Sequence, residues 1–235
     1  MSFVKDNLVL VKEKIAAAAV KSGRRPEDIC LVAVTKTIPL VQIEAAAAAG
    51  IKHIGESRIQ EAKAKADDNF SELTWHLIGH LQRNKAKLAL EIFDLIHSLD
   101  SLRLAHALQR RAEELDRTVD CLLQVNVAGE QSKYGILPDQ LPSLLRELSS
   151  LSRLKVRGLM TIAPYAKDPE QVRPVFRSLR QLACDMRRSR LPRISLDELS
   201  MGMSGDFEVA IEEGATLVRV GTAIFGHRKG RGIKQ

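Results

Sequence analysis

Lys36 is the side chain in this sequence with the clearest capacity for covalent chemistry. It follows residues 30–35 (CLVAVT), a short apolar run typical of a buried strand. A lysine partly removed from water loses proton affinity, so its neutral amine can attack an aldehyde and form an imine. The alternative is a strand-end lysine whose ammonium simply reaches water.

A second group of polar residues lies near the end of the chain. Arg219 is followed by Gly221 and Thr222, and an earlier segment contains Ser200 and Ser204. Backbone N–H groups and short hydroxyls in such loops commonly bind phosphate, and glycine lets the backbone approach it closely. The alternative is a pair of ordinary Gly/Ser turns.

Together these residues could meet the needs of pyridoxal 5′-phosphate (PLP). That cofactor requires an amine for its aldehyde, donors for its phosphate and a partner for its pyridine nitrogen. Lys36 offers the amine, Ser200, Gly221 and Thr222 offer the donors, and Arg219 offers the partner.

The elements that must position these residues alternate between strand and helix. The predicted strands are short and apolar, at 30–35, 51–56, 74–79, 93–98, 121–127, 155–161, 197–201 and 216–221. The predicted helices lie at 39–49, 57–67, 81–91, 101–115, 138–150, 169–188 and 205–213.

Strict alternation indicates a parallel sheet, and eight units in a chain of 235 residues favour a single closed (β/α)₈ (TIM) barrel. An open doubly wound sheet is the alternative. We expect a single domain with an N-terminal helix and lead-in at 1–29, the barrel at 30–226 and a basic tail at 227–235. The functional residues should then gather at the C-terminal ends of the strands.

Composition and charge limit the classes of partner. The formal charge of +7 raises nucleic acid as a partner, but the basic residues are spread and aromatic residues make up only 4%. No segment is long enough to cross a bilayer, and no signal peptide is visible. Three widely separated cysteines predict reduced thiols and a cytoplasmic location.

Several residues carry alternatives that weaken a catalytic interpretation. His76, His80 and His97 lack a metal-ligand arrangement, so we favour structural histidines and expect no metal site. Lys133 could accept an aldehyde, but a solvated loop lysine is favoured. Met201 and Met203 are expected in a tight turn, with side chains that fill core gaps.

Seven segments resemble the PLP homeostasis protein family, whose members are PLP-binding barrels similar to the N-terminal domain of alanine racemase. The similarity runs from about residue 10 to residue 226. The segments are AVTKT (33–37), GESRIQEAKAK (55–65), WHLIGHLQRNK (75–85), IHSLDS (96–101), NVAGEQSKYG (126–135), RGLMTI (157–162) and LSMGMSGDFEVAIEEGATLVRVGTAIFG (199–226).

The resemblance implies specific roles for these residues. Lys36 looks like the Schiff-base lysine, and Arg219 looks like the partner of the pyridine nitrogen. The implied phosphate contacts are Ser200, Met201, Gly221 and Thr222, with Ser204 a weaker candidate. The family pattern G-E-N-x-x-Q-E reads GESRIQE here, so Ser57 takes the place of the customary asparagine. Ser57 is a candidate cofactor-binding residue that could reach PLP through water, and the alternative is that it makes no contact.

Two functions from different classes follow. Arg219 stays protonated and should keep the pyridine nitrogen unprotonated, which weakens the cofactor as an electron sink. A racemase of this architecture also needs a second base, typically a tyrosine from another domain, and only Tyr134 and Tyr165 are present. We therefore predict a non-catalytic carrier that delivers PLP, with an amino-acid racemase as the alternative.

The expected partners are PLP and, as recipients, apo forms of PLP-dependent enzymes. We expect a monomer that binds neither membrane nor nucleic acid.

Overall fold

The computed structural model describes residues 2–66, 70–130 and 132–226, and the proposed basic tail at 227–235 lies outside that range. Eight parallel strands form a closed barrel in which each strand pairs with the next and β8 pairs with β1. The strands are β1 (Cys30–Val34), β2 (His53–Glu56), β3 (Thr74–Leu77), β4 (Leu95–Leu99), β5 (Val119–Gln124), β6 (Leu154–Met160), β7 (Ile194–Met203) and β8 (Leu217–Val220). The prediction of a closed barrel is confirmed, and the open sheet is excluded.

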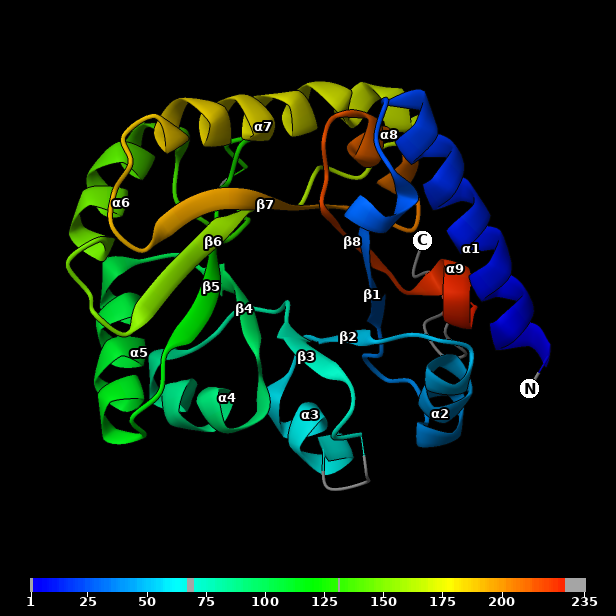
Figure 1. The fold of residues 1–235 in the computed structure, drawn as a ribbon, viewed down its shortest axis with the longest axis horizontal. Coiled ribbons are helices and arrows are strands. Elements are labelled where there is room, and N and C mark those ends of the chain that lie inside the picture. Colours follow the sequence, from blue (N-terminus) through cyan, green and yellow to red (C-terminus); the bar gives the residue numbers. More distant parts are fainter. Residues whose placement is uncertain (1, 67–69, 131, 227–235) are drawn as a thin grey trace.

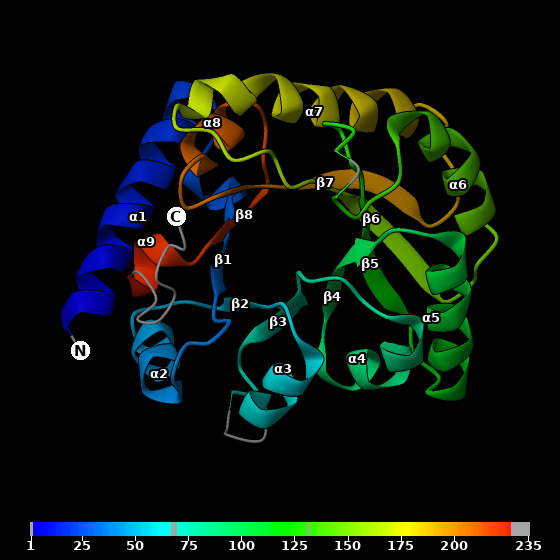
Figure 2. The same ribbon diagram turned by 180° about the vertical axis from the view of Figure 1, so that it is seen from behind.

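Helices surround the barrel in the order of the chain (Figures 1 and 2). They are α1 (Ser2–Lys21), α2 (Leu40–Ala48), α3 (Ile59–Ala66), α4 (Ala86–Ile92), α5 (Leu102–Glu114), α6 (Leu141–Leu148), α7 (Arg173–Arg187), α8 (Phe207–Glu212) and α9 (Thr222–Phe225). Short 3₁₀ turns occur at Pro26–Asp28, Arg83–Lys85, Pro138–Gln140 and Pro169–Val172. Among the described helices, none is long and apolar enough to span a membrane.

The N-terminal helix covers the side of the barrel where the strands β8 and β1 meet. α1 packs beside α8 and α9, as Figure 1 shows along one edge of the molecule. Its buried face includes Leu8, Val11, Ile15 and Ala19, spaced three or four residues apart as in an amphipathic helix. Burial of this apolar stripe fixes α1 on the barrel.

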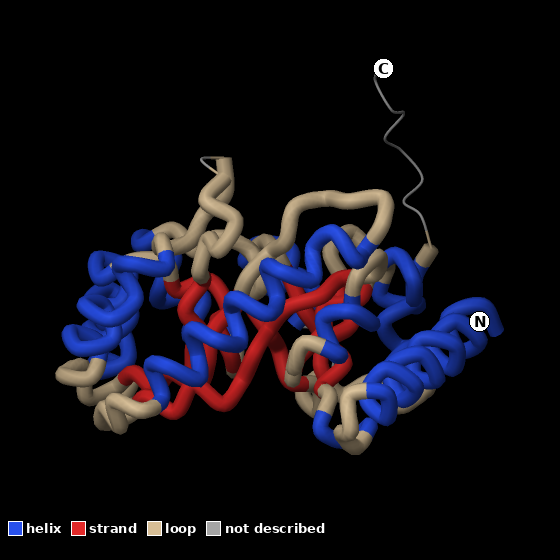
Figure 3. The backbone as a smooth tube through the Cα atoms, turned by 90° about the horizontal axis from the view of Figure 1, so that it is seen from above, coloured by secondary structure: helices blue, strands red, loops and turns tan. Residues whose placement is uncertain are grey.

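Two clusters of buried apolar side chains stabilise the barrel. A large cluster fills the space between strands and helices, and a small cluster lies separately from it. The small cluster consists of Val32, Leu95, Leu122, Met160 and Leu217. Figure 3 shows the strands enclosed between helices, with long loops rising from one side.

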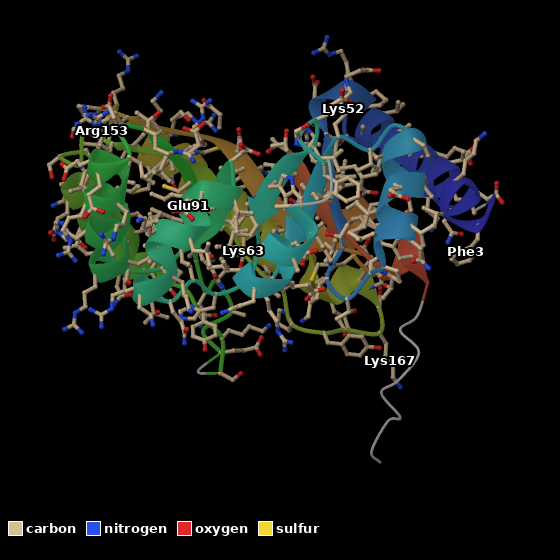
Figure 4. The ribbon with its side chains drawn as sticks, turned by 90° about the horizontal axis from the view of Figure 1, so that it is seen from below. Phe3, Lys52, Lys63, Glu91, Arg153 and Lys167 are labelled. Carbon is tan, nitrogen blue, oxygen red and sulfur yellow. The ribbon has the colours of Figure 1, made fainter. Side chains whose placement is uncertain are left out.

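The two ends of the barrel are distinct. Lys167, in the loop after β6, lies on one side, whereas Lys52 and Arg153, which precede β2 and β6, lie on the other (Figure 4). Parallel strands place all their carboxyl ends on the Lys167 side, which is where barrels carry their functional residues.

Candidate functional site at the C-terminal ends of the strands

The backbone register brings the residues that follow β1 and β8 side by side. β1 and β8 pair with Val32 opposite Arg219, so Gly221 follows β8 at the level of Val34. A Cβ atom added to Gly221 would lie 3.3 Å from Val34 Cβ. Lys36 lies two residues beyond Val34, which places it at the same end of the barrel as Gly221.

Lys36 lies in a turn with an unusual backbone. Its side chain is half-buried, and within the described residues no ion pair or hydrogen bond engages its ammonium. Thr37 has a φ of 63°, a left-handed conformation that costs energy for a β-branched residue. The Thr37 N–H donates to a carboxylate oxygen of Glu61, which holds the turn in place.

A buried ion pair stabilises the turn that contains Lys36. Lys65 Nζ lies 2.6 Å from Glu56 Oε1 and 3.0 Å from Glu61 Oε1, and it donates to the Thr35 carbonyl at 2.7 Å. Burial raises the pKa of Glu56, while hydrogen bonds from Lys65 and Thr35 oppose that rise. These contacts join the end of β1, the end of β2 and α3, and they hold the backbone on both sides of Lys36.

Arg219 is held inside the barrel by two acceptors. Its Nη1 donates to Ser200 Oγ at 2.5 Å and its Nη2 donates to the Thr161 carbonyl at 2.8 Å. Burial lowers the pKa of Arg219 to about 10, with Asp206 opposing, so the guanidinium remains charged at neutral pH. A fixed cation therefore lies beside β1, the strand that precedes Lys36.

The two serines occupy different surroundings. Ser200 is fully buried and contacts Arg219 and His97. Ser204 is half-buried, and its Oγ accepts from the backbone N–H groups of Gly221 at 3.2 Å and Ala223 at 3.3 Å. Of the two, only Ser204 lies with the glycine and the short helix α9, where donors for a phosphate gather.

The remaining predicted contacts differ in exposure. Thr222 is exposed and begins α9, so its hydroxyl is accessible. Met201 is fully buried and packs in the core, so it can offer only backbone groups. Met201 and Met203 were expected in a tight turn, and this is wrong, because both lie in β7. Met203, the last residue of β7, is also 37% exposed, so it does not fill a core gap as expected.

Ser57 follows β2 at the same end of the barrel. Its side chain is half-buried, and its backbone packs tightly against Gly79, where an added Cβ would lie 2.2 Å from the Ser57 carbonyl oxygen. Glycine at position 79 is therefore required for β2 and β3 to end side by side.

Histidines on three consecutive strands line the barrel interior. His76 and His97 are buried and hydrogen-bonded to each other, and His53 extends the chain. His80 lies apart, 3.2 Å from Asp100. Within the described ranges no group of His, Cys, Asp and Glu could hold a metal ion. His53 was not predicted as part of this group, although one histidine on each of three consecutive strands is a visible signal in the sequence.

The two tyrosines and Lys133 lie in loops at the same end. Tyr165 is 92% exposed, and Tyr134 is 58% exposed and stacks on His80 with ring centroids 3.9 Å apart. Lys133 Nζ lies 2.6 Å from Glu130, next to a cavity of about 130 Å³. Unlike Lys36, Lys133 is already paired with a carboxylate.

Comparison with known proteins identifies the family to which the chain is similar. The family model described as alanine racemase, N-terminal domain, matches residues 12–229. The pyridoxal phosphate homeostasis protein of Aquifex aeolicus is 44% identical over 225 residues, covering 95% of this chain and 98% of that protein. The protein of the same name from Escherichia coli K12 is 44% identical over 236 residues, covering 97% and 98%.

Solved structures show the same fold. PipY of Synechococcus elongatus PCC7942, solved with PLP bound, superposes with a TM-score of 0.80 at 42% identity and covers 92% of this chain and 100% of its own. Alanine racemase of Clostridium difficile 630 shares the fold with a TM-score of 0.73 at 14% identity, covering 98% of this chain and 61% of that one. The chain therefore belongs to the pyridoxal phosphate homeostasis protein family, within the alanine racemase N-terminal domain fold.

Proposed function

We propose that this protein binds PLP through a covalent link to Lys36 and delivers it to apo-enzymes without turning over amino acids. The observation that carries the proposal is that Arg219 lies on β8, which pairs with β1, while Gly221 and Lys36 follow these two strands at the same end of the barrel. PLP would supply an aldehyde for the amine and a phosphate for the loop. PipY, a relative with PLP bound, supports this assignment.

The residues present fit that cofactor. The Lys36 amine is not engaged by any described carboxylate, so it is available to an aldehyde. The amides of Gly221 and Ala223 already point at a hydroxyl oxygen, that of Ser204, which shows that they can serve an oxygen acceptor. Thr222 adds an accessible hydroxyl at the same place.

Arg219 favours carriage over catalysis. A guanidinium with a pKa of about 10 stays charged at neutral pH and cannot accept a proton, so a pyridine nitrogen facing it would remain unprotonated. An unprotonated ring stabilises a carbanion poorly, and most amino-acid chemistry of PLP depends on that stabilisation. The arrangement holds the cofactor but limits its reactivity.

A racemase is the competing function, and the tyrosines decide how it would work. Racemisation needs a proton removed on one face and delivered on the other. Tyr165 is almost fully exposed, and Tyr134 stacks on His80, so neither is enclosed beside Lys36 in the way that an acid–base partner requires.

One experiment separates the two functions. PLP-loaded protein is incubated with single amino acids in heavy water and, separately, with a PLP-dependent apo-enzyme. We expect recovery of the apo-enzyme's activity and no sustained deuterium incorporation at Cα. Turnover of an amino acid by the unmodified protein that is lost in Lys36→Ala would contradict the carrier proposal. If Tyr134→Phe also lost this turnover, Tyr134 would be assigned as the second base.

The setting proposed for this function is the cytoplasm, with the protein as a monomer. The three cysteines are free thiols, two of them at least partly buried, which suits a reducing compartment. Size-exclusion chromatography with light scattering tests the monomer, since a mass of twice 26.1 kDa would contradict it.

A further inference from the structure

Three histidines form a continuous hydrogen-bonded chain through the barrel interior. His53 Nδ1 lies 3.0 Å from His76 Nε2, and His76 Nδ1 lies 2.8 Å from His97 Nε2. His97 Nδ1 lies 2.9 Å from Ser200 Oγ, which also accepts from Arg219 Nη1. The chain thus connects Arg219, at the candidate cofactor site, with the opposite end of the barrel.

The direction of hydrogen-bond donation along this chain of histidines is fixed at Ser200. A guanidinium only donates hydrogen bonds, so Ser200 Oγ accepts from Arg219 and its own hydrogen needs an acceptor. Ser200 is fully buried, and among the described residues His97 Nδ1 is the other partner of its hydroxyl. Because an unpartnered buried donor is costly, Ser200 donates to His97 Nδ1.

The direction of donation between the three histidines follows from their neutral rings. Burial lowers the pKa of His97 well below its usual value, and His76 and Arg219 lower it further. Burial likewise lowers the pKa of His76 to about 3. A neutral histidine that accepts at Nδ1 carries its hydrogen on Nε2, so His97 donates to His76 and His76 donates to His53.

The surroundings of His53, at the far end of the histidine chain, favour the same direction of hydrogen-bond donation. His53 lines a cavity of about 410 Å³ at the N-terminal ends of the strands. The titratable and charged groups around that cavity, besides His53 and His76, are Glu27, Asp28, Cys30, Asp94, Asp120, Arg157 and Glu198, and Lys52 precedes His53 in the chain. Carboxylates outnumber cations there, so an N–H at His53 Nε2 is favoured over a lone pair.

We propose that His97 is a positioning residue for the cofactor site, holding Ser200 as an acceptor for Arg219, with the hydrogen on Nε2 in all three histidines. With Ser200 on Nη1 and the Thr161 carbonyl on Nη2, the guanidinium is fixed in orientation. The inference rests on the proposed role of Arg219 as the partner of the pyridine nitrogen.

The direction of the chain can be measured without any cofactor. Nitrogen-15 correlation spectra of the histidine side chains in PLP-free protein distinguish a protonated ring nitrogen from an unprotonated one. We expect Nε2–H and a bare Nδ1 for His53, His76 and His97 at neutral pH. A hydrogen on Nδ1 of His97 would overturn the proposed direction, whether or not the protein binds PLP.

The positioning role is tested with two substitutions at one residue. Asparagine at position 97 keeps an acceptor where His97 has Nδ1, whereas leucine removes it. We expect PLP to bind about tenfold more weakly to His97→Leu, the effect of losing one hydrogen bond, and binding to recover in His97→Asn. The pH dependence of the visible absorption of bound PLP should also change in His97→Leu and stay the same in His97→Asn. His106→Asn, on the exposed face of α5, serves as the control.

The outcomes remain separable. A folded His97→Leu with unchanged PLP affinity and pH profile would overturn the positioning role. If His97→Leu does not fold, Ser200→Ala removes the same link from the other side and should give the same changes. Failure of the unmodified protein to bind PLP would contradict the proposed function instead, while the nitrogen-15 spectra would still report the direction of the chain.

Discussion

Lys65 forms an ion pair with Glu56, 2.6 Å from Nζ to Oε1, and both side chains are buried beneath the turn that carries Lys36. The second oxygen of Glu56, Oε2, is buried and has no hydrogen-bond partner among the described residues. Lys65 is thus the main compensation for a carboxylate enclosed in the protein, and its loss would leave that charge unpaired.

Lys65→Met should therefore destabilise the protein strongly. Removal of one partner from a buried ion pair costs about 3–5 kcal/mol of unfolding free energy. Lys63→Met changes an exposed lysine on the same helix and should cost far less (Figure 4). Urea denaturation of both variants measures the difference, and equal free energies of unfolding would contradict the assigned role of Lys65.

The same pair predicts a pH dependence. Burial raises the pKa of Glu56 above its ordinary value, so the folded protein binds this proton more tightly than the unfolded chain does. The contribution of Glu56 to stability is therefore greatest at low pH and falls as pH rises through its folded pKa. Without Lys65 the pKa rises further, so Lys65→Met should lose less stability at about pH 5 than at about pH 8. A pH-independent loss would show that Glu56 is not the group left unpaired.

Ser204 and Ser200 should affect ligand binding differently. Ser204→Ala and Thr222→Ala should each weaken PLP binding by about 1–3 kcal/mol, the range for a hydrogen bond to a charged group, and should leave pyridoxal binding unchanged. Ser200→Ala should weaken both ligands, because Ser200 contacts Arg219 rather than the Gly221 loop. Isothermal titration with PLP and pyridoxal compares them. Equal affinity of the unmodified protein for the two ligands would remove the phosphate site.

Gly202 allows β7 to approach α8 closely. It has a φ of 90°, and an added Cβ would lie 2.6 Å from Ala210 Cβ and 2.9 Å from Phe207 Cα. Gly202→Ala combines backbone strain with overpacking, and we expect a loss of about 2–4 kcal/mol in unfolding free energy. Gly205→Ala, three residues further along the chain and in open space, is the matched control. Equal thermal midpoints for the two variants would argue against this packing.

The order of the elements could be predicted from sequence because each strand is a short apolar run between helical segments. The first and last residues of the strands and helices could not be predicted. β7 reaches from Ile194 to Met203, longer than the predicted 197–201, and the short helix α9 was not predicted. Strand ends depend on pairing with neighbours, and a helix of one turn leaves almost no periodic pattern.

The candidate site was predictable in part for a similar reason. Lys36, Arg219 and Gly221 stand at strand ends, which the chain order alone locates. The separation of Ser200 from Ser204 depends on which way each side chain points at the end of β7. The link from His53 to Ser200 depends on the stagger of four strands around a closed barrel, which no local pattern contains.

Borohydride reduction of the PLP-loaded protein, followed by peptide mapping, shows whether Lys36 is the residue that holds PLP. Reduction fixes an imine as a stable amine, so the modified lysine can be identified by mass spectrometry. We expect the label on the peptide that contains Lys36, and its absence from a folded Lys36→Ala variant, with Lys133→Ala labelled as in the unmodified protein. Label on Lys133 instead, retained in Lys36→Ala, would contradict the account.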